Sequence, residues 1–359
     1  MSTTDNLTIS RILTQAAERQ VSDIHLSAGN QPVFRRDGKL EILNQEEMLT
    51  PELLMEMIQI LVPPEKQTIL QQQKSITVSF SLGTRARFRV HVDYQKNFPD
   101  LDLRYIPMVV PTPEKLGLDK NLISLTDRRE GLIIISGPLG SGRTTTLTSL
   151  VDKLNHTSAE HILTLEDPIE YLLVNDKSLI KQRDLGDDSP SLVQALDDVK
   201  IEDVDVVAVD APIPASAWPQ LLNLASAGIL VLVVLEADST VRALESLTAG
   251  SIPNTGDRGF DQLLAEIFIG ASCQRLLPRL GGGRILVTEL LLGTPAVKSL
   301  LREGKAAQLQ SILETSRAEG MVSLERGLAD LVKTGEIQSD EAVSQAANKD
   351  SIKSMLRMR

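Results

Sequence analysis

The chain has 359 residues, a formal net charge of −11 and a hydrophobic content of 42%. Its length allows two or three domains, and its apolar content excludes a globally disordered chain. The acidic balance argues against nucleic-acid binding as the main function.

A single cysteine, Cys273, excludes an internal disulfide framework and is typical of the cytosol. The first residues lack the basic and apolar regions of a signal peptide. The longest apolar run, residues 229–235, is too short to span a membrane and indicates a buried central strand. The four histidines are not spaced as zinc ligands, so no zinc site is predicted.

The N-terminal region mixes helical spacing with strand alternation. Thr50 caps one helix, with Pro51 at its first position, and Asp37-Gly38 is a strong hairpin signal. These patterns predict an α+β domain over residues 1–106. Its expected helices are 8–19, 51–61 and 65–73, and its expected strands outside the hairpin are 22–26, 76–80, 85–94 and 101–105.

Residues 107–113, PMVVPTP, form the clearest boundary, because three prolines stiffen an extended linker. Beyond it, residues 114–359 are expected to form a second domain. Strands there alternate with helices, which predicts an α/β fold with a mostly parallel sheet. The expected strands are 132–136, 162–165, 204–209 and 229–235. From about residue 241 the chain is expected to be mainly helical, broken by a hairpin at 281–283.

Residues 131–150, GLIIISGPLGSGRTTTLTSL, contain a strand, a glycine-rich loop and a helix start, the context of a phosphate-binding P-loop. Glycines let backbone N–H groups surround phosphate oxygens, and the helix N-terminus attracts the same anion. A glycine turn without a ligand is the alternative. The candidate nucleotide-binding residues are Gly137, Pro138, Gly140, Ser141, Gly142, Arg143, Thr144 and Thr145, with Thr144 also a candidate Mg²⁺ ligand.

Arg143 is the one departure from the P-loop pattern, which has lysine at this position. Lysine is a compact point charge that reaches the β- and γ-phosphates of ATP. Arginine keeps the charge on a wider, forked group, so the exchange is not conservative in a tight site. We expect weakened or altered nucleotide binding.

Several segments together resemble the type IV pilus retraction ATPases (PilT), within the type II and IV secretion ATPase superfamily. They are SDIHLSAGNQP, GPLGSGRTTTL, HILTLEDPIEY and a tail that includes GTPAVKSLLREGK. The resemblance covers residues 9–342. It implies a PAS-like N-terminal domain, a RecA-like ATPase domain that uses ATP and Mg²⁺, and a hexameric ring. It also implies a cytoplasmic motor at the pilus base, peripheral to the inner membrane, with an inner-membrane platform protein as partner.

Matched to this family, the chain keeps only part of the active site. Glu170, in the segment EDPIE, matches the candidate catalytic base, with a solvated surface carboxylate as the alternative. The family's Walker B glutamate falls on Ala211. Asp210, one position earlier, could contribute to a Mg²⁺ shell or could cap the strand end. The family's two histidines around the following strand are replaced by Ile229 and Glu236.

The resemblance also marks charged residues outside these motifs. Arg87, Arg89 and Arg104 match N-terminal arginines that are candidates to reach a neighbouring subunit's nucleotide, with ordinary strand-face charge as the alternative. Asp197 and Asp198 stand where the family has arginines, and two acids near a polyphosphate site would repel it.

These changes predict a retraction-motor homologue that binds ATP but hydrolyses it weakly or not at all. It would act in a homomeric ring or in a mixed ring with an intact paralogue. An active ATPase that uses Glu170, Arg143 and Asp210 is one alternative. A pilus-machinery scaffold that binds no nucleotide is another.

Overall fold

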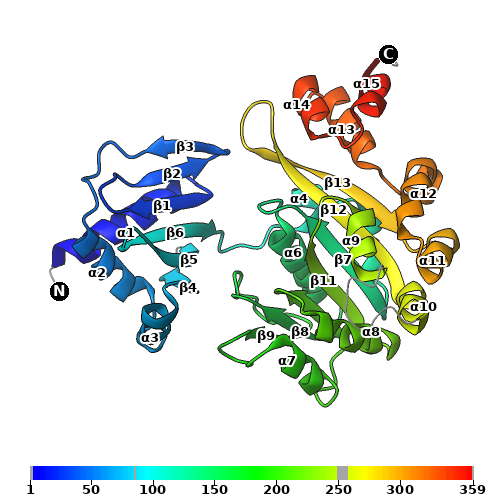
Figure 1. Cartoon of the computed structure of the whole chain (residues 1–359), viewed down its shortest axis with the longest axis horizontal. Helices are drawn as coiled ribbons and strands as arrows, with labels where there is room; N and C mark the ends of the chain where they lie inside the picture. The colour runs from blue at the N-terminus through cyan, green and yellow to red at the C-terminus, as the bar shows by residue number, and fades with distance from the viewer. Residues whose placement is uncertain (1–2, 85, 249–257, 358–359) are drawn as a thin grey trace. The chain divides into compact units, whose positions relative to one another are not determined.

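The computed structural model describes residues 3–84, 86–248 and 258–357, which form two compact units (Figure 1). The first unit comprises Met1–Val110 and Pro168–Leu172. The second comprises Pro111–Asp167 and Leu173–Arg359. The short segment 168–172 therefore packs with the first unit although its flanking residues belong to the second.

The first unit is an antiparallel sheet with strand order β3-β2-β1-β6-β5-β4 and helices packed on its apolar face. In β5, every second side chain from Ala86 to Val92 is buried, as alternation on a half-covered sheet requires. Asp37 and Gly38 both have positive φ, the conformation of the expected two-residue hairpin. The elements are α1 (Thr3–Glu18), β1 (Asp23–Ser27), β2 (Val33–Arg36), β3 (Lys39–Ile42), α2 (Pro51–Leu61), α3 (Pro64–Gln73), β4 (Ile76–Leu82), β5 (Ala86–Gln95) and β6 (Phe98–Ile106).

The second unit is built on a seven-stranded sheet of order β13-β12-β7-β11-β10-β8-β9. All neighbouring strands are parallel except β12 and β13, which form an antiparallel hairpin. The predicted fold class is therefore confirmed. The strands are β7 (Gly131–Gly137), β8 (His161–Glu166), β9 (Leu179–Asp184), β10 (Val206–Asp210), β11 (Leu230–Glu236), β12 (Phe268–Pro278) and β13 (Arg284–Leu292).

Helices cover both faces of this sheet, which explains why its central strands are apolar throughout. Ile133 and Ile135 of β7 pack on the side of α6, and Leu132 and Ile134 pack on the side of α8. The helices before the C-terminal region are α4 (Pro113–Leu116), α5 (Lys120–Leu125), α6 (Arg143–Thr157), α7 (Leu192–Val199), η1 (Ala215–Ala217), α8 (Trp218–Ser226), α9 (Thr240–Thr248) and α10 (Arg258–Ile267).

Short helices follow β13 and end the chain. Thr294 caps α11 as the sequence predicts, and its hydroxyl accepts the N–H of Val297. The last three helices share a small core with the end of the β12–β13 hairpin. The elements are α11 (Pro295–Arg302), η2 (Ala306–Gln308), α12 (Leu309–Thr315), η3 (Arg317–Glu319), α13 (Leu324–Lys333), α14 (Ser339–Gln345) and α15 (Lys349–Arg357).

One strand differs from the prediction, because the edge strand β9 was not predicted. The described residues after 241 are mainly helical, as expected, and the hairpin expected at residues 281–283 joins two long strands, β12 and β13, which extend the central sheet beside β7. Among the described helices, none is both long and apolar enough to cross a membrane.

Candidate functional site

The glycine-rich loop connects buried β7 to the N-terminus of the 15-residue helix α6. Gly140 and Gly142 have φ of +76° and +88°, a region that other residues enter only at a cost. Gly142 is the N-cap of α6, and Arg143, Thr144 and Thr145 are in its first turn. The first N–H groups of a helix have no intrahelical acceptor, so this loop presents donors suited to an anion.

Strand β12, which pairs with β7, also contacts the loop. A Cβ on Gly137 would collide with the hydroxyl of Ser141 and would lie 2.6 Å from the carbonyl oxygen of Gln274 in β12. The Gln274 side chain is fully buried, and its Nε2 donates to the carbonyl oxygen of Ser141 at 2.9 Å. Gln274 was not predicted from the sequence. Ser272 and Arg275 are polar too in this strand, so polarity alone did not mark Gln274.

The loop has the features that a phosphate group requires. The Ser141 side chain is 3% exposed, and its hydroxyl has no hydrogen-bond partner among the described residues. A buried hydroxyl without a partner costs about 1 to 3 kcal/mol, which a bound anion or water would offset. Together with the glycine conformations, this hydroxyl makes residues 137–145 fit a nucleotide phosphate.

Arg143 turns away from the loop toward the neighbouring strand. Its Nη1 donates to the carbonyl oxygen of Leu235, near the end of β11, at 2.9 Å. In the parallel pairing of β7 and β11, Leu235 lies opposite Ser136 and Glu236 lies opposite Gly137. Glu236, which is exposed and at which the resemblance predicts a replaced histidine, therefore lies beside Gly137, the first residue of the loop. A negative charge there opposes polyphosphate binding.

Carboxylates follow the neighbouring strands at the same edge of the sheet. Asp210 ends β10 and pairs in register with Glu166, the last residue of β8. Glu166 is 5% exposed, and its Oε1 accepts the Thr164 hydroxyl at 2.6 Å and the Gln182 amide at 3.0 Å. Carboxyl ends of parallel strands are where α/β proteins bind ligands. Glu166 was not predicted as a site residue from the sequence. Within the same EDPIE segment, only the last residue, Glu170, was matched to a catalytic role.

Ala211, at the family glutamate position, follows Asp210 directly and is partly buried against the core. It has no polar group, so a base in this place is absent. Among the described residues, no three histidine, cysteine or carboxylate side chains form a group that could hold a metal ion.

Glu170 is held inside the first unit by strands β4 and β5. Arg89 Nη1 donates to Glu170 Oε1 at 2.8 Å, and the Glu170 side chain is 10% exposed. The preceding carbonyl, of Ile169, accepts the Ser79 hydroxyl at 2.7 Å and Arg87 Nη2 at 2.9 Å. We call these three contacts the 169–170 clasp.

The remaining predicted charges also have partners within their own units. Arg104 donates to Asp23 at 2.9 Å, so the three candidate arginines all make contacts inside the first unit. In the second unit, Asp197 pairs with Lys200 and Asp198 pairs with Arg183. The expected repulsion from these two acids is therefore largely balanced by adjacent cations.

Two buried ionisable groups lie on the hairpin next to β7. Burial raises the pKa of the Cys273 thiol to about 12, with the nearby Glu289 carboxylate adding to the effect. Burial also raises the pKa of Glu289, although hydrogen bonds from the hydroxyl and the backbone of Thr240 oppose this shift. A thiol with so high a pKa is not suited to act as a nucleophile at neutral pH.

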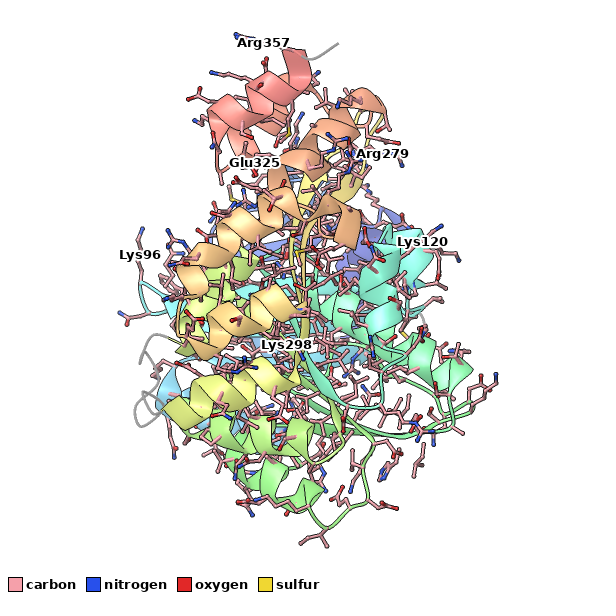
Figure 2. The ribbon with its side chains drawn as sticks, turned by 90° about the vertical axis from the view of Figure 1, so that its right-hand side faces the viewer. Lys96, Lys120, Arg279, Lys298, Glu325 and Arg357 are labelled. Atoms are coloured by element: carbon pink, nitrogen blue, oxygen red, sulfur yellow. The ribbon has the colours of Figure 1, made fainter. Side chains whose placement is uncertain are left out.

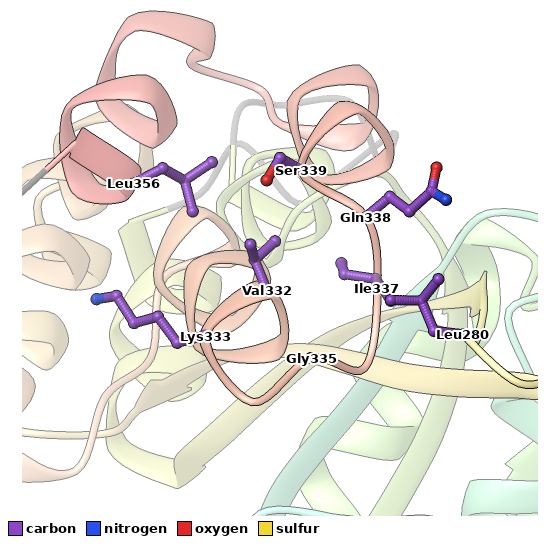
Figure 3. Close-up of a pocket in the computed structure, with 8 residues that line it drawn as sticks. All are labelled: Leu280, Val332, Lys333, Gly335, Ile337, Gln338, Ser339 and Leu356. Atoms are coloured by element: carbon purple, nitrogen blue, oxygen red, sulfur yellow. The ribbon is translucent and has the colours of Figure 1, made fainter. Parts of the chain in front are cut away.

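A cavity of about 370 Å³ lies in the C-terminal helical part, away from these groups (Figure 3). Its lining combines apolar and polar side chains, and the ammonium of Lys333 points away from the other lining side chains (Figure 3). Gly335 is the one glycine among its lining residues, so it lacks the glycine-rich loop of residues 137–142. The lining residues are Leu280, Val332, Lys333, Gly335, Ile337, Gln338, Ser339 and Leu356.

The chain matches known proteins along most of its length. The family model described as "Type II/IV secretion system protein" matches residues 4–183. The "Type IV pilus retractation ATPase PilT" of Pseudomonas aeruginosa is 32% identical over 338 residues, which cover 94% of this chain and 98% of that protein. The "Type IV pilus ATPase PilU" of the same organism is 28% identical, covering 97% and 91%.

A solved structure has a similar fold. The structure titled "Crystal Structure of the Pilus Retraction Motor PilT and Bound ADP" superposes with a TM-score of 0.84 at 32% identity. The superposition covers 96% of this chain and 99% of the other. The similarity thus extends over both units.

Proposed function

The chain belongs to the PilT-like type II/IV secretion ATPase family, and we propose that it binds ATP at residues 137–145 and hydrolyses it weakly or not at all. It serves as a subunit of a type IV pilus retraction motor. The observation that carries nucleotide binding is the loop itself, with two left-handed glycines, a helix N-terminus and the unpaired buried hydroxyl of Ser141. The ADP-bound relative supports this proposal.

Mg²⁺ would be held by the Thr144 hydroxyl in the first turn of α6, with Asp210 at the end of β10 as a further contributor. The ion would neutralise charge that develops on the phosphates. Arg143 would supply a positive charge from the same turn once its guanidinium leaves the Leu235 carbonyl.

Weak hydrolysis follows from the groups that would handle the attacking water. Ala211 offers no base at the end of β10, and Glu236 is an acid beside Gly137. Glu170, the candidate base, is already engaged, because its carboxylate forms an ion pair with Arg89. Losing a positioned base or charge in phosphoryl transfer costs orders of magnitude in rate, although several losses do not add.

The oligomer and its partners belong to the same proposal. A ring of six subunits, homomeric or mixed with an intact paralogue, would place the protein in the cytoplasm at the inner-membrane base of the pilus. A membrane platform protein would be its contact there. The relatives named as pilus motor ATPases support this role.

Calorimetric titration of the purified full chain with Mg-ATP and with metal-free ADP tests nucleotide binding. We expect both to bind. Thr144→Ala should weaken Mg-ATP binding about tenfold or more and change metal-free ADP binding little, because the hydroxyl serves the metal.

Thr157→Ala is the matched control, since it makes the same change at the last position of α6, about 20 Å away. It should bind like the unaltered protein. Absence of binding by the unaltered protein would overturn the proposal in favour of a scaffold. Equal Mg-ATP binding by Thr144→Ala would overturn the role of Thr144 at the metal.

A further inference from the structure

Residues 235–240, which run from the end of β11 to the first residue of α9, adjoin the phosphate loop at one end. Arg143, in the first turn of α6, donates to the carbonyl oxygen of Leu235 at 2.9 Å. A phosphate in the loop would compete with this carbonyl for the guanidinium, because anionic oxygens are the stronger acceptors. Nucleotide binding would therefore change how the first residue of the segment is held.

Side chains from the β12–β13 hairpin hold the rest of the segment. The Cys273 thiol lies 3.6 Å from the Ala237 carbonyl oxygen, and Arg275 Nη2 donates to the Asp238 carbonyl oxygen at 3.2 Å. The Glu289 carboxylate accepts both the N–H and the hydroxyl of Thr240, each at 2.7 Å. Three positions of the segment, 237, 238 and 240, are thus contacted by side chains of the neighbouring hairpin.

Two of these side chains also hold the C-terminal helices. Arg275 Nη1 donates to the carbonyl oxygen of Gln345, the last residue of α14, at 2.6 Å. The buried Glu289 also accepts a backbone hydrogen bond from Leu324, the first residue of α13. Each side chain therefore joins the segment directly to one C-terminal helix.

Strand β12 contacts both the phosphate loop and residues 235–240. Side chains alternate along a strand, so Gln274 faces the phosphate loop while Cys273 and Arg275 face residues 235–240. The planar guanidinium of Arg275 makes its two carbonyl contacts in a fixed fork, so a shift of one carbonyl acts on the other. A lysine could reach only one of them with comparable geometry.

We propose that Arg275 is a positioning residue that couples nucleotide in the phosphate loop to helix α14 through residues 235–240. The coupling runs from phosphate to Arg143, to the Leu235 carbonyl, along the segment to Asp238, and through Arg275 to Gln345. Glu289 provides a second, parallel connection from Thr240 to α13. This inference rests on the proposed nucleotide binding.

Hydrogen exchange of the full chain with and without Mg-ADP tests the coupling, at a fixed oligomeric state checked by light scattering. In the unaltered protein, Mg-ADP should slow exchange in the loop and also, by roughly fivefold or more, in α13 and α14. In Arg275→Lys, which keeps the charge but loses the fork, loop slowing should persist. The slowing in α14 should fall below about twofold, whereas α13, which Glu289 joins to Thr240, should keep its slowing.

Arg279→Met is the control. Arg279 follows β12, and its Nη2 donates to Glu336, near α13, at 3.0 Å; Figure 2 shows it and Glu325 beside the last helices. The Arg279 side chain makes no hydrogen bond or ion pair with residues 235–240, so this variant should match the unaltered protein. Full slowing of α14 in Arg275→Lys, or slowing confined to the loop in the unaltered protein, would overturn the coupling. Absence of slowing in the loop itself would overturn nucleotide binding, and the coupling with it.

Discussion

At the scale of single residues, the chemistry of the site depends on where two side chains are directed. Arg143 keeps the positive charge expected in a phosphate loop, but its guanidinium donates a hydrogen bond to a backbone carbonyl. Glu170 keeps the carboxylate expected of a base but is paired with Arg89. Both identities are readable from the sequence, whereas both partners are distant in the chain and are not.

The Cys273 thiol gives a pH-dependent test of how β12 packs. Its pKa rises from 9.0 to about 12, so at pH 8 the reactive thiolate is about a thousandfold rarer than in the unfolded chain. We expect alkylation of the native protein at pH 8 to be slower by about that factor. The rate should rise about tenfold per pH unit until the pKa is approached.

Because Cys273 is the one cysteine of the chain, mass spectrometry of the alkylated protein reports this site alone. Labelling in denaturant provides the reference rate, and Cys273→Ser provides the unlabelled baseline. A native rate within about tenfold of the denatured rate would show that the thiol is not buried as described.

At the scale of elements, the 169–170 clasp predicts an energetic coupling. Arg89 and Glu170 form a charge-assisted contact with exposed fractions of 31% and 10%. A double-mutant cycle with Arg89→Met and Glu170→Gln should give a coupling of about 1 to 2 kcal/mol in the unfolding of the first unit. Urea-dependent hydrogen exchange of the β4–β6 amides measures it.

The exposed pair Arg36 and Glu41, in the same unit, is the comparison. Its side chains are 47% and 38% exposed, so solvent screening should keep the coupling below about 1 kcal/mol. Similar values for both pairs would mean that burial adds nothing to the clasp.

Element types followed from the sequence where the pattern was local. Strand β7, the Thr50 cap and the turn at Asp37-Gly38 each depend on a few consecutive residues. Strand β9, LIKQRD, was missed because an edge strand buries little and carries polar residues. The hairpin turn at residues 281–283 was predicted, but the length of β12 was not, because Phe268–Pro278 is largely buried on both sides and its period did not separate strand from helix.

The candidate site was predictable to the same extent. The glycine loop and Thr144 have a fixed spacing, which made them visible. Gln274 and Arg275 act on residues far away in sequence, and their roles depend on the pairing of β12 with β7. The grouping of residues 168–172 with the first unit likewise depends on contacts some 80 to 90 positions apart.

At the scale of the whole molecule, the similarity to PilT covers nearly the full chain. The changes expected from the sequence fall on one function, because the resemblance predicts that the family's lysine, Walker B glutamate and two histidines are replaced at Arg143, Ala211, Ile229 and Glu236. This division is the basis for proposing a protein that binds ATP and turns it over slowly.

Steady-state phosphate release from the purified full chain in Mg-ATP, with its oligomeric state measured alongside, tests this claim most directly. Glu170→Gln serves as the inactive reference, and Arg143→Lys restores the family residue in the loop. We predict release no faster than the reference for the unaltered protein, in a sample that binds Mg-ATP. Phosphate release by the unaltered protein, in which Arg143 is present, that disappears in Glu170→Gln would contradict the account. It would identify an active retraction motor.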